Sequence, residues 1–279
     1  MKNHIAQSIE GEPPQIEIEL VPLGDDERKA AILWLNRPDS LNAINWRALH
    51  ELEAALASAE KDSSVRAVLI IGRGRAFSAG GDIKAYKGLQ ADDAAFTAFV
   101  DDCCRLHDGI GAMTKPVIAL VNGLCAAGGL ELLLACDFAW AAQSARIGDM
   151  HVNYAQIGGS GAMARLPRLI GQARSLELVF SGEMLDSSLA LEWGIVNRVV
   201  ADDHLLEEGL RFARSLAAKS PNAIKFVKRS IRHGMELGLV DALKFERDQC
   251  LQYCLNFPDS MEGINAFIEK REPVFRNDP

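Results

Sequence analysis

Two glycine-rich segments, about fifty residues apart, place the strongest constraint on how this chain folds. The first runs from Gly72 to Ile83 and the second from Asn122 to Glu131, and each follows a short apolar run. A strand that turns through glycines into a helix leaves backbone N–H groups unpaired at the turn. Two such turns facing each other would aim two N–H donors at one point, as in an oxyanion hole. The pattern therefore predicts a site that stabilises negative charge on a carbonyl oxygen.

Length, charge and composition exclude several classes of protein. A chain of 279 residues can bury a full core as one large domain, with or without an appendage. Its net charge of −8 argues against a nucleic-acid partner, because phosphate binding needs a basic surface. No apolar run reaches the length of a membrane span, so no membrane partner is expected. Residues 1–14 contain no apolar signal region, so we interpret them as a loose tail and expect a cytoplasmic protein.

Neither the spacing of the cysteines nor any cofactor-binding motif in the sequence indicates a metal or redox centre. The six cysteines form no C-x-x-C pair, and Cys250 and Cys254 have no histidine near them in the sequence. We therefore expect buried free thiols and no metal site. The chain also carries no nicotinamide or flavin fingerprint, so no separate cofactor is expected.

Hydrophobic patterning divides the chain into two parts. Strands alternate with helices up to residue 200, and only helices follow. The strands are expected at 16–21, 30–35, 65–71, 116–121, 138–141, 145–148 and 195–200, and the main helices at 45–61, 91–113, 129–136, 165–171, 173–181, 187–193, 205–219, 221–235, 239–256 and 260–269. This order predicts an α/β core over residues 15–200 and a helical C-terminal region over residues 201–279.

The glycine-rich segments belong to a longer, ordered set of motifs. The set includes Leu35-Asn36-Arg37-Pro38, Gly74 to Lys84, Lys115 to Glu131, Arg165 to Gly171 and Ala190 to Asn197. In this order the motifs resemble the enoyl-CoA hydratase/isomerase (crotonase) superfamily over nearly the whole chain after the tail. The resemblance implies a spiral of ββα repeats and a helical C-terminal region used in trimerisation, with trimers commonly pairing into hexamers.

The same resemblance implies an acyl-CoA thioester as substrate and assigns residues to it. Coenzyme A is carried as part of the substrate, and the family's chemistry needs no further cofactor. Ala79 and Gly128 match the positions whose backbone N–H groups form the oxyanion hole. The residues that match the coenzyme A contacts are Ala43, Asp82 and Ile83, which hold the adenine ring through their backbone, and Lys84 and Arg37, whose side chains can meet the phosphates.

Glu131 matches one of the two catalytic glutamates of the hydratases. It lies three residues after Gly128, one turn along the helix that leaves the oxyanion hole. Its neighbours are leucines, which argues against a solvated surface carboxylate. Burial against an apolar acyl pocket would suit this carboxyl group to acid–base work.

The position of the second hydratase glutamate is occupied by a histidine. Twenty residues after Glu131 the chain has His151, and Asp149 is the alternative if the register is shifted by two. A histidine can replace the carboxylate as a base, because its pKa lies near neutrality. A purely structural role for His151 stays open. The turn Gly158-Gly159-Ser160-Gly161, in place of the family's proline-containing turn, is expected to shape the start of the next helix near the acyl pocket.

The residues therefore favour a hydratase-like lyase that adds water to a 2-enoyl-CoA thioester, in fatty acid metabolism. Because the second glutamate is replaced by His151, three alternatives stay open. The first is an enoyl-CoA isomerase, and the second is a hydrolase of C–C or thioester bonds from the same superfamily. The third is a non-catalytic acyl-CoA-binding protein.

Overall fold

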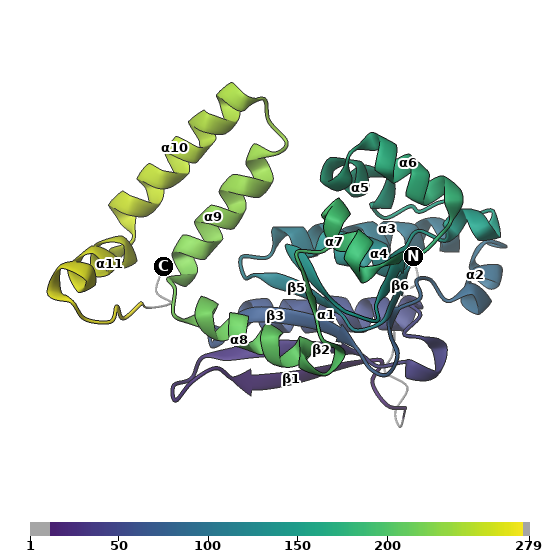
Figure 1. Cartoon of the computed structure of the whole chain (residues 1–279), viewed down its shortest axis with the longest axis horizontal. Coiled ribbons are helices and arrows are strands. Elements are labelled where there is room, and N and C mark those ends of the chain that lie inside the picture. Colours follow the sequence, from purple (N-terminus) through teal and green to yellow (C-terminus); the bar gives the residue numbers. More distant parts are fainter. Residues whose placement is uncertain (1–11, 276–279) are drawn as a thin grey trace.

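A sheet of six strands is the larger of two sheets in the computed structural model, which describes residues 12–275 (Figure 1). Its order is β1-β2-β3-β5-β7-β10, and all neighbours except the antiparallel pair β1 and β2 are parallel. The strands are β1 (Ile16–Pro22), β2 (Lys29–Leu35), β3 (Val65–Gly72), β5 (Val117–Val121), β7 (Phe138–Ala142) and β10 (Arg198–Val200). Every residue of β3 and β5 is buried, as is typical of parallel strands covered on both faces.

A second, smaller sheet has the order β4-β6-β8-β9. Its strands are β4 (Ala76–Ser78), β6 (Leu124–Ala126), β8 (Arg146–Gly148) and β9 (Leu185–Asp186). From β3 to β8, consecutive strands alternate between the two sheets, because β3 leads to β4, β5 to β6 and β7 to β8. A Cβ atom on Gly72 would lie 1.9 Å from the Ala76 carbonyl oxygen, so the tight turn between β3 and β4 requires glycine. The predicted α/β spiral of ββα repeats is confirmed.

Helices cover the two sheets. They are α1 (Trp46–Lys61), α2 (Ile83–Leu89), α3 (Asp93–Ala112), α4 (Gly128–Ala135), α5 (Ala162–Ile170), α6 (Gln172–Ser181) and α7 (Ser187–Trp193), with short 3-10 turns η1 (Pro38–Ser40), η2 (His151–Tyr154) and η3 (Asp202–His204). Helix α1 begins where the pattern predicts, because the Asn45 side chain accepts a hydrogen bond from Ala48 N at 2.8 Å. Its buried leucines, Leu49, Leu52 and Leu56, recur at three- and four-residue spacing and face the core.

The helices at the C-terminal end form two groups. Helix α8 (Leu205–Ala217) packs on the larger sheet, with Leu205 and Ala213 buried. Helices α9 (Pro221–Gly234), α10 (Leu239–Asn256) and α11 (Pro258–Glu269) extend away from the core (Figure 1). The predicted division at residues 200/201 thus falls before a helix that belongs to the core by its packing. The projecting part of the chain begins at Pro221.

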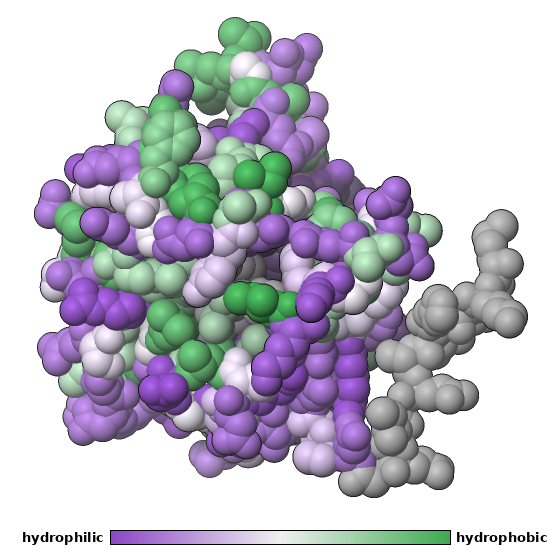
Figure 2. All heavy atoms as spheres, turned by 90° about the vertical axis from the view of Figure 1, so that its right-hand side faces the viewer, coloured by the Kyte–Doolittle hydropathy of each residue, from purple (hydrophilic) through white to green (hydrophobic). Residues whose placement is uncertain are grey.

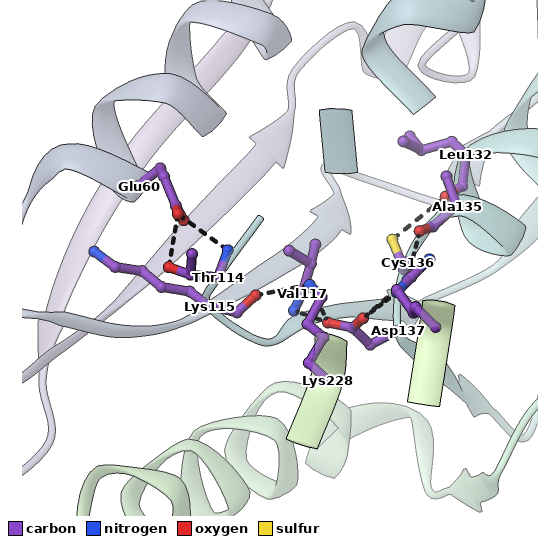
Figure 3. Close-up of polar contacts among 10 residues, drawn as sticks. Glu60, Thr114, Lys115, Val117, Leu132, Ala135, Cys136, Asp137 and Lys228 are labelled. Atoms are coloured by element: carbon purple, nitrogen blue, oxygen red, sulfur yellow. Dashed lines mark hydrogen bonds and ion pairs between the residues drawn. The ribbon is translucent and has the colours of Figure 1, made fainter. Parts of the chain in front are cut away.

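A largely buried ion pair fixes α9 to the core. Lys228 Nζ lies 2.8 Å from Asp137 Oδ2 and donates to the Lys115 carbonyl oxygen at 3.0 Å (Figure 3). The Lys228 side chain is 10% exposed, and burial lowers its pKa although the Asp137 charge opposes this. Arg232 reaches Asp137 Oδ1 at 2.8 Å, and Val117 N donates to Asp137 Oδ2. Asp137 therefore joins the start of β5 to α9.

The described part of the predicted N-terminal tail is held against the core. Arg47 Nη1 lies 2.5 Å from Glu12 Oε2, and Arg47 Nη2 donates to the Pro13 carbonyl oxygen at 3.0 Å. Asn36 Nδ2 donates to the Pro14 carbonyl oxygen at 3.1 Å. Residues 12–14 are therefore not loose, and residues 1–11 lie outside the described residues.

The thiols and acidic side chains form no metal centre within residues 12–275, where no three His, Cys, Asp or Glu side chains are grouped to hold an ion. The six cysteines are free thiols, as predicted. Cys125 and Cys136 are buried, whereas Cys250 and Cys254 are exposed on α10, so the expected burial is wrong for that pair. In the same range, no helix has both the length and the apolar content to cross a membrane.

Candidate active site

The two glycine-rich turns lie face to face, as the sequence predicts. The first turn links β4 to α2, and the second links β6 to α4. A Cβ atom on Gly80 would lie 2.8 Å from Gly128 N, and one on Gly128 would lie 3.4 Å from Gly81 N. Gly80 has φ +95°, and Ala127, the residue before α4, has φ +49°, a left-handed conformation that is strained for alanine. The close approach therefore requires glycine at position 80, whereas a Cβ atom at position 128 would make only ordinary van der Waals contacts.

The N–H groups that remain unpaired at this contact belong to Gly81 and Gly128. No hydrogen bond within residues 12–275 uses either group. Gly128 is the first residue of α4, so its N–H lacks a helical partner. Ala79 N instead donates to the Leu41 carbonyl oxygen at 2.9 Å. The structure contradicts the prediction of a free N–H donor at Ala79, because that group already pairs with the loop after η1.

Glu131 projects from the first turn of α4 and is held by the segment that begins α5. Its side chain is buried, with the residue 4% exposed. Ser160 donates twice, from N to Oε1 at 2.8 Å and from Oγ to Oε2 at 2.6 Å. Ala162 N adds a longer contact of 3.4 Å to Oε1. Three donors from one short segment fix the carboxylate in a single orientation, as a buried charge requires.

His151 and Asp149, the two positions that the sequence offered as alternatives, are joined by a hydrogen bond. Asp149 is 0% exposed, and its Oδ1 accepts hydrogen bonds from His151 N at 3.0 Å and from His151 Nδ1 at 2.8 Å. This bond orients the ring and leaves Nε2 as the other polar atom. Burial alone would lower the pKa of His151, but the hydrogen bond and charge of Asp149, with the charge of Glu131, raise it above its usual value.

Gly158 brings Glu131 and His151 to one place. A Cβ atom on Gly158 would lie 2.9 Å from Glu131 Oε1 and 3.2 Å from His151 Cε1. The carboxylate and the imidazole therefore flank the same backbone position. His107 supports this segment from α3, because its Nδ1 donates to the Ser160 carbonyl oxygen at 2.9 Å. Burial lowers the pKa of His107, which keeps this ring neutral.

The predicted coenzyme A residues lie together at the start of α2. Arg37 Nη2 lies 2.8 Å from Asp82 Oδ2, and Arg37 Nη1 donates to the Ala43 carbonyl oxygen. Burial alone would raise the pKa of Asp82. The hydrogen bonds from Arg37 and from the Ala85 N–H have the larger combined effect and hold this pKa below its usual range. Ile83, 62% exposed, and Lys84 lie on the surface next to this cluster. Contact of these five residues with coenzyme A stays a prediction.

Apolar side chains remain exposed on the face that carries α2 and α6, where they lie among hydrophilic ones (Figure 2). Ile83 on α2 and Phe180 on α6 are exposed, as are Tyr154 and Ile157 in the segment between β8 and α5. Exposed apolar side chains of this kind suit contact with the apolar portion of a ligand.

The fold and the two facing, unpaired N–H groups define a class of protein that can stabilise an anion beside a carboxylate and an imidazole. Comparison with known proteins identifies the family. The model of the enoyl-CoA hydratase/isomerase family matches residues 26–278, and the chain belongs to this family.

Three similar proteins illustrate the relationship. A "Probable enoyl-CoA hydratase" of Rhizobium meliloti is 36% identical over 255 residues, covering 91% of this chain and 97% of that protein. A "Crotonyl-CoA hydratase" of Syntrophomonas wolfei is 36% identical over 253 residues, covering 90% and 96%. The crystal structure of an enoyl-CoA hydratase from Bacillus anthracis superposes with a TM-score of 0.88 at 31% identity, covering 95% and 100%.

Three functional contacts were not predicted from the sequence. These three features of the candidate site are the Ser160 hydrogen bonds to Glu131, the Asp149–His151 hydrogen bond and the unpaired N–H of Gly81. Ser160 lies 29 residues from Glu131, and only the packing of α5 on α4 shows that they meet. Asp149 was a detectable signal, because a carboxylate two residues from a candidate base is placed to orient it.

Proposed function

We propose that this enzyme is an enoyl-CoA hydratase that adds water across the double bond of a 2-enoyl-CoA thioester. The observation that carries the proposal is the convergence of Glu131 and His151 at Gly158, next to two facing turns with unpaired N–H groups. The Gly81 and Gly128 N–H groups would bind the thioester oxygen. This polarisation makes Cβ electrophilic and stabilises the enolate that forms when water attacks.

The acid and base follow from the surroundings of each group. The Glu131 carboxylate takes a proton from water as the oxygen bonds to Cβ. His151, with its pKa raised by Asp149, enters as the imidazolium and gives its proton to Cα. After the reaction, Glu131 carries the proton that it took from water. This proton passes to His151 before the next cycle. A carboxylate and an imidazolium together carry one transferable proton, as do two carboxyl groups that share one.

The direct test is a spectrophotometric assay with crotonyl-CoA that follows loss of the conjugated thioester. Glu131→Gln should lower kcat by about 10²- to 10⁴-fold, the usual contribution of a positioned acid–base group. His151→Gln should lower it by a similar factor, whereas a structural His151 would leave kcat near that of wild type. Absence of turnover by the wild-type enzyme, with crotonyl-CoA still binding, would contradict the hydratase assignment.

The Asp149–His151 pair gives specific support to a second candidate, a hydrolase of the same superfamily. A histidine oriented by a buried carboxylate is the arrangement that activates a nucleophile toward a carbonyl group. Hydrolysis of a thioester releases free thiol, and hydration does not. A thiol reagent added to the crotonyl-CoA assay therefore separates the two reactions, and a 3-enoyl-CoA substrate tests the isomerase.

We further propose that the chain assembles as a homotrimer through the projecting helices, with pairing of two trimers as a further possibility to test. Helices α9, α10 and α11 expose large apolar side chains, including Val227, Ile231, Leu239, Val240 and Phe267. An apolar surface of this kind is typical of an interface. Light scattering on the purified protein should give a mass of three or six chains, and a monomer would contradict the proposal. The cytoplasmic location stays a prediction.

A further inference from the structure

Tyr86 lies directly beside the unpaired N–H of Gly81. It is the fourth residue of α2, and Tyr86 N donates to the Asp82 carbonyl oxygen at 2.9 Å. A Cβ atom on Gly81 would lie 2.6 Å from Tyr86 Cε2 and 3.1 Å from Cζ, the carbon that bears the hydroxyl group. The phenol is therefore next to the backbone donor to which we assign the thioester oxygen.

The ring of Tyr86 is fixed by two phenylalanines of α3. It packs edge to face with Phe96 and Phe99, at centroid distances of 5.8 and 5.6 Å and interplanar angles of 76° and 82°. Phe99 is itself buried in the core. Edge-to-face contacts on two sides hold an aromatic ring in one orientation. The position of the hydroxyl group is thus set by packing before any ligand binds.

The hydroxyl group of Tyr86 has no assigned partner. No hydrogen bond within residues 12–275 uses it, and its oxygen is not among the fully buried polar atoms of that range. Burial, and then the negative charges of Cys103 and Glu131 in their ionised forms, raise the pKa of Tyr86 to about 12. The phenol therefore keeps its proton at neutral pH and is available as a donor.

We infer that the Tyr86 hydroxyl is a third hydrogen-bond donor to the enolate oxygen, beside the N–H groups of Gly81 and Gly128. The inference rests on the proposed enolate chemistry, but it concerns binding of the oxyanion and not transfer of protons. A tyrosine hydroxyl is a suitable donor to such an oxygen, because it is fixed in advance and carries no charge that the empty site must solvate. Tyr86 would then be a catalytic residue, since it touches the reacting oxygen.

The test is Tyr86→Phe, which removes the hydroxyl group and keeps the ring that packs on Phe96 and Phe99. Two ligands distinguish binding of the enolate from binding of the ground-state thioester. Acetoacetyl-CoA is an enolisable thioester that mimics the intermediate, and butyryl-CoA is a saturated thioester without this property. The matched control is Tyr253→Phe, on α10 at the other end of the molecule (Figure 1), where the hydroxyl contacts Ser220.

The expected result is a selective loss. Tyr86→Phe should weaken acetoacetyl-CoA binding by about tenfold or more relative to butyryl-CoA, and should lower kcat for crotonyl-CoA by about 100-fold with little change in KM. Tyr253→Phe should change neither. An unchanged ratio of the two affinities in Tyr86→Phe would overturn the inference. If wild type fails to hydrate crotonyl-CoA but the selective loss is seen, the donor role stands and the hydratase proposal fails.

Discussion

The hydrogen bond from His151 to Asp149 makes the activity depend on pH in a defined direction. If imidazolium is the acid, kcat/KM falls as pH rises through the pKa of His151, which Asp149 and Glu131 raise above 6.5. Asp149→Asn removes both the charge and the strong acceptor. We expect the descending limb to move to lower pH, because the interactions that raise the pKa of His151 are weakened. A pH–rate profile of both proteins checks this, and activity that rises with pH would instead identify neutral His151 as a base.

Replacement of Gly158 is a second single-residue test of the site, because it probes the position where Glu131 and His151 meet. In Gly158→Ala the new methyl group would lie 2.9 Å from Glu131 Oε1 and 3.2 Å from His151 Cε1, so one of the two groups must shift. A displacement of about 1 Å in an acid–base pair costs about 100-fold in rate, and kcat should fall by that factor or more. Gly159→Ala is the matched control, because its Cβ would meet the flexible end of Val100 at 3.3 Å. Equal activities of the two variants would contradict the proposed geometry.

Residue roles that depend on spacing along one element could be predicted from the sequence, and those that depend on packing could not. Glu131 lies one helical turn after Gly128, so the sequence places both at the same end of α4. Whether Ala79 or Gly81 supplies a free N–H donor depends on which of the two groups faces the second turn and which faces Leu41. Only the packing of the two loops decides this.

At the scale of elements, α4 is positioned by the close approach of Gly129 to β4. A Cβ atom on Gly129 would lie 2.3 Å from the Ser78 carbonyl oxygen, and backbone cannot move aside as a flexible side chain can. Gly129→Ala should therefore destabilise the protein by about 1–3 kcal/mol through overpacking. It should also lower activity, because α4 carries both Gly128 and Glu131.

The matched control is Gly109→Ala in the long helix α3, where no atom lies within 4 Å of the new Cβ. Alanine reduces the conformational freedom of the unfolded chain, so this variant should be more stable by about 0.5–1 kcal/mol. Urea denaturation of both variants gives the comparison. A stabilised Gly129→Ala would show that α4 does not pack on β4 as described.

Elements with a clear hydrophobic period were predicted well, and very short ones were missed. The predicted helix 45–61 matches α1 closely, because its apolar residues recur at helical spacing. Strands β4 and β6 have three residues each, too few to show alternation, and both lie inside glycine-rich segments that were interpreted as turns. Of the second sheet, the pattern predicted only β8, as the strand expected at 145–148.

For the whole molecule, Asp137 is the point that holds the projecting helices to the core. Asp137→Asn removes the charge that pairs with Lys228 and Arg232, and it leaves the ammonium group of Lys228, whose side chain is 10% exposed, without its countercharge. Loss of one partner from a buried pair should destabilise the protein by about 3 kcal/mol. Lys228→Met should cost less, because Asp137 keeps Arg232 and the Val117 N–H. Thermal denaturation at fixed protein concentration tests the order of the two variants, and the reverse order would contradict it.

The backbone origin of the two unpaired N–H groups has a consequence for how such a protein can diversify. A donor that belongs to the main chain cannot be deleted by replacing a side chain, provided that the turn still closes. An anion-binding role carried by these two N–H groups would therefore be insensitive to most point mutations, whereas a proton-transfer role would depend on ordinary side chains that are free to change. A histidine at position 151 beside an intact pair of glycine turns is an instance of this separation. If the two N–H groups bind the enolate as proposed, the reaction on a thioester can change by exchange of one or two side chains while the backbone donors stay in place.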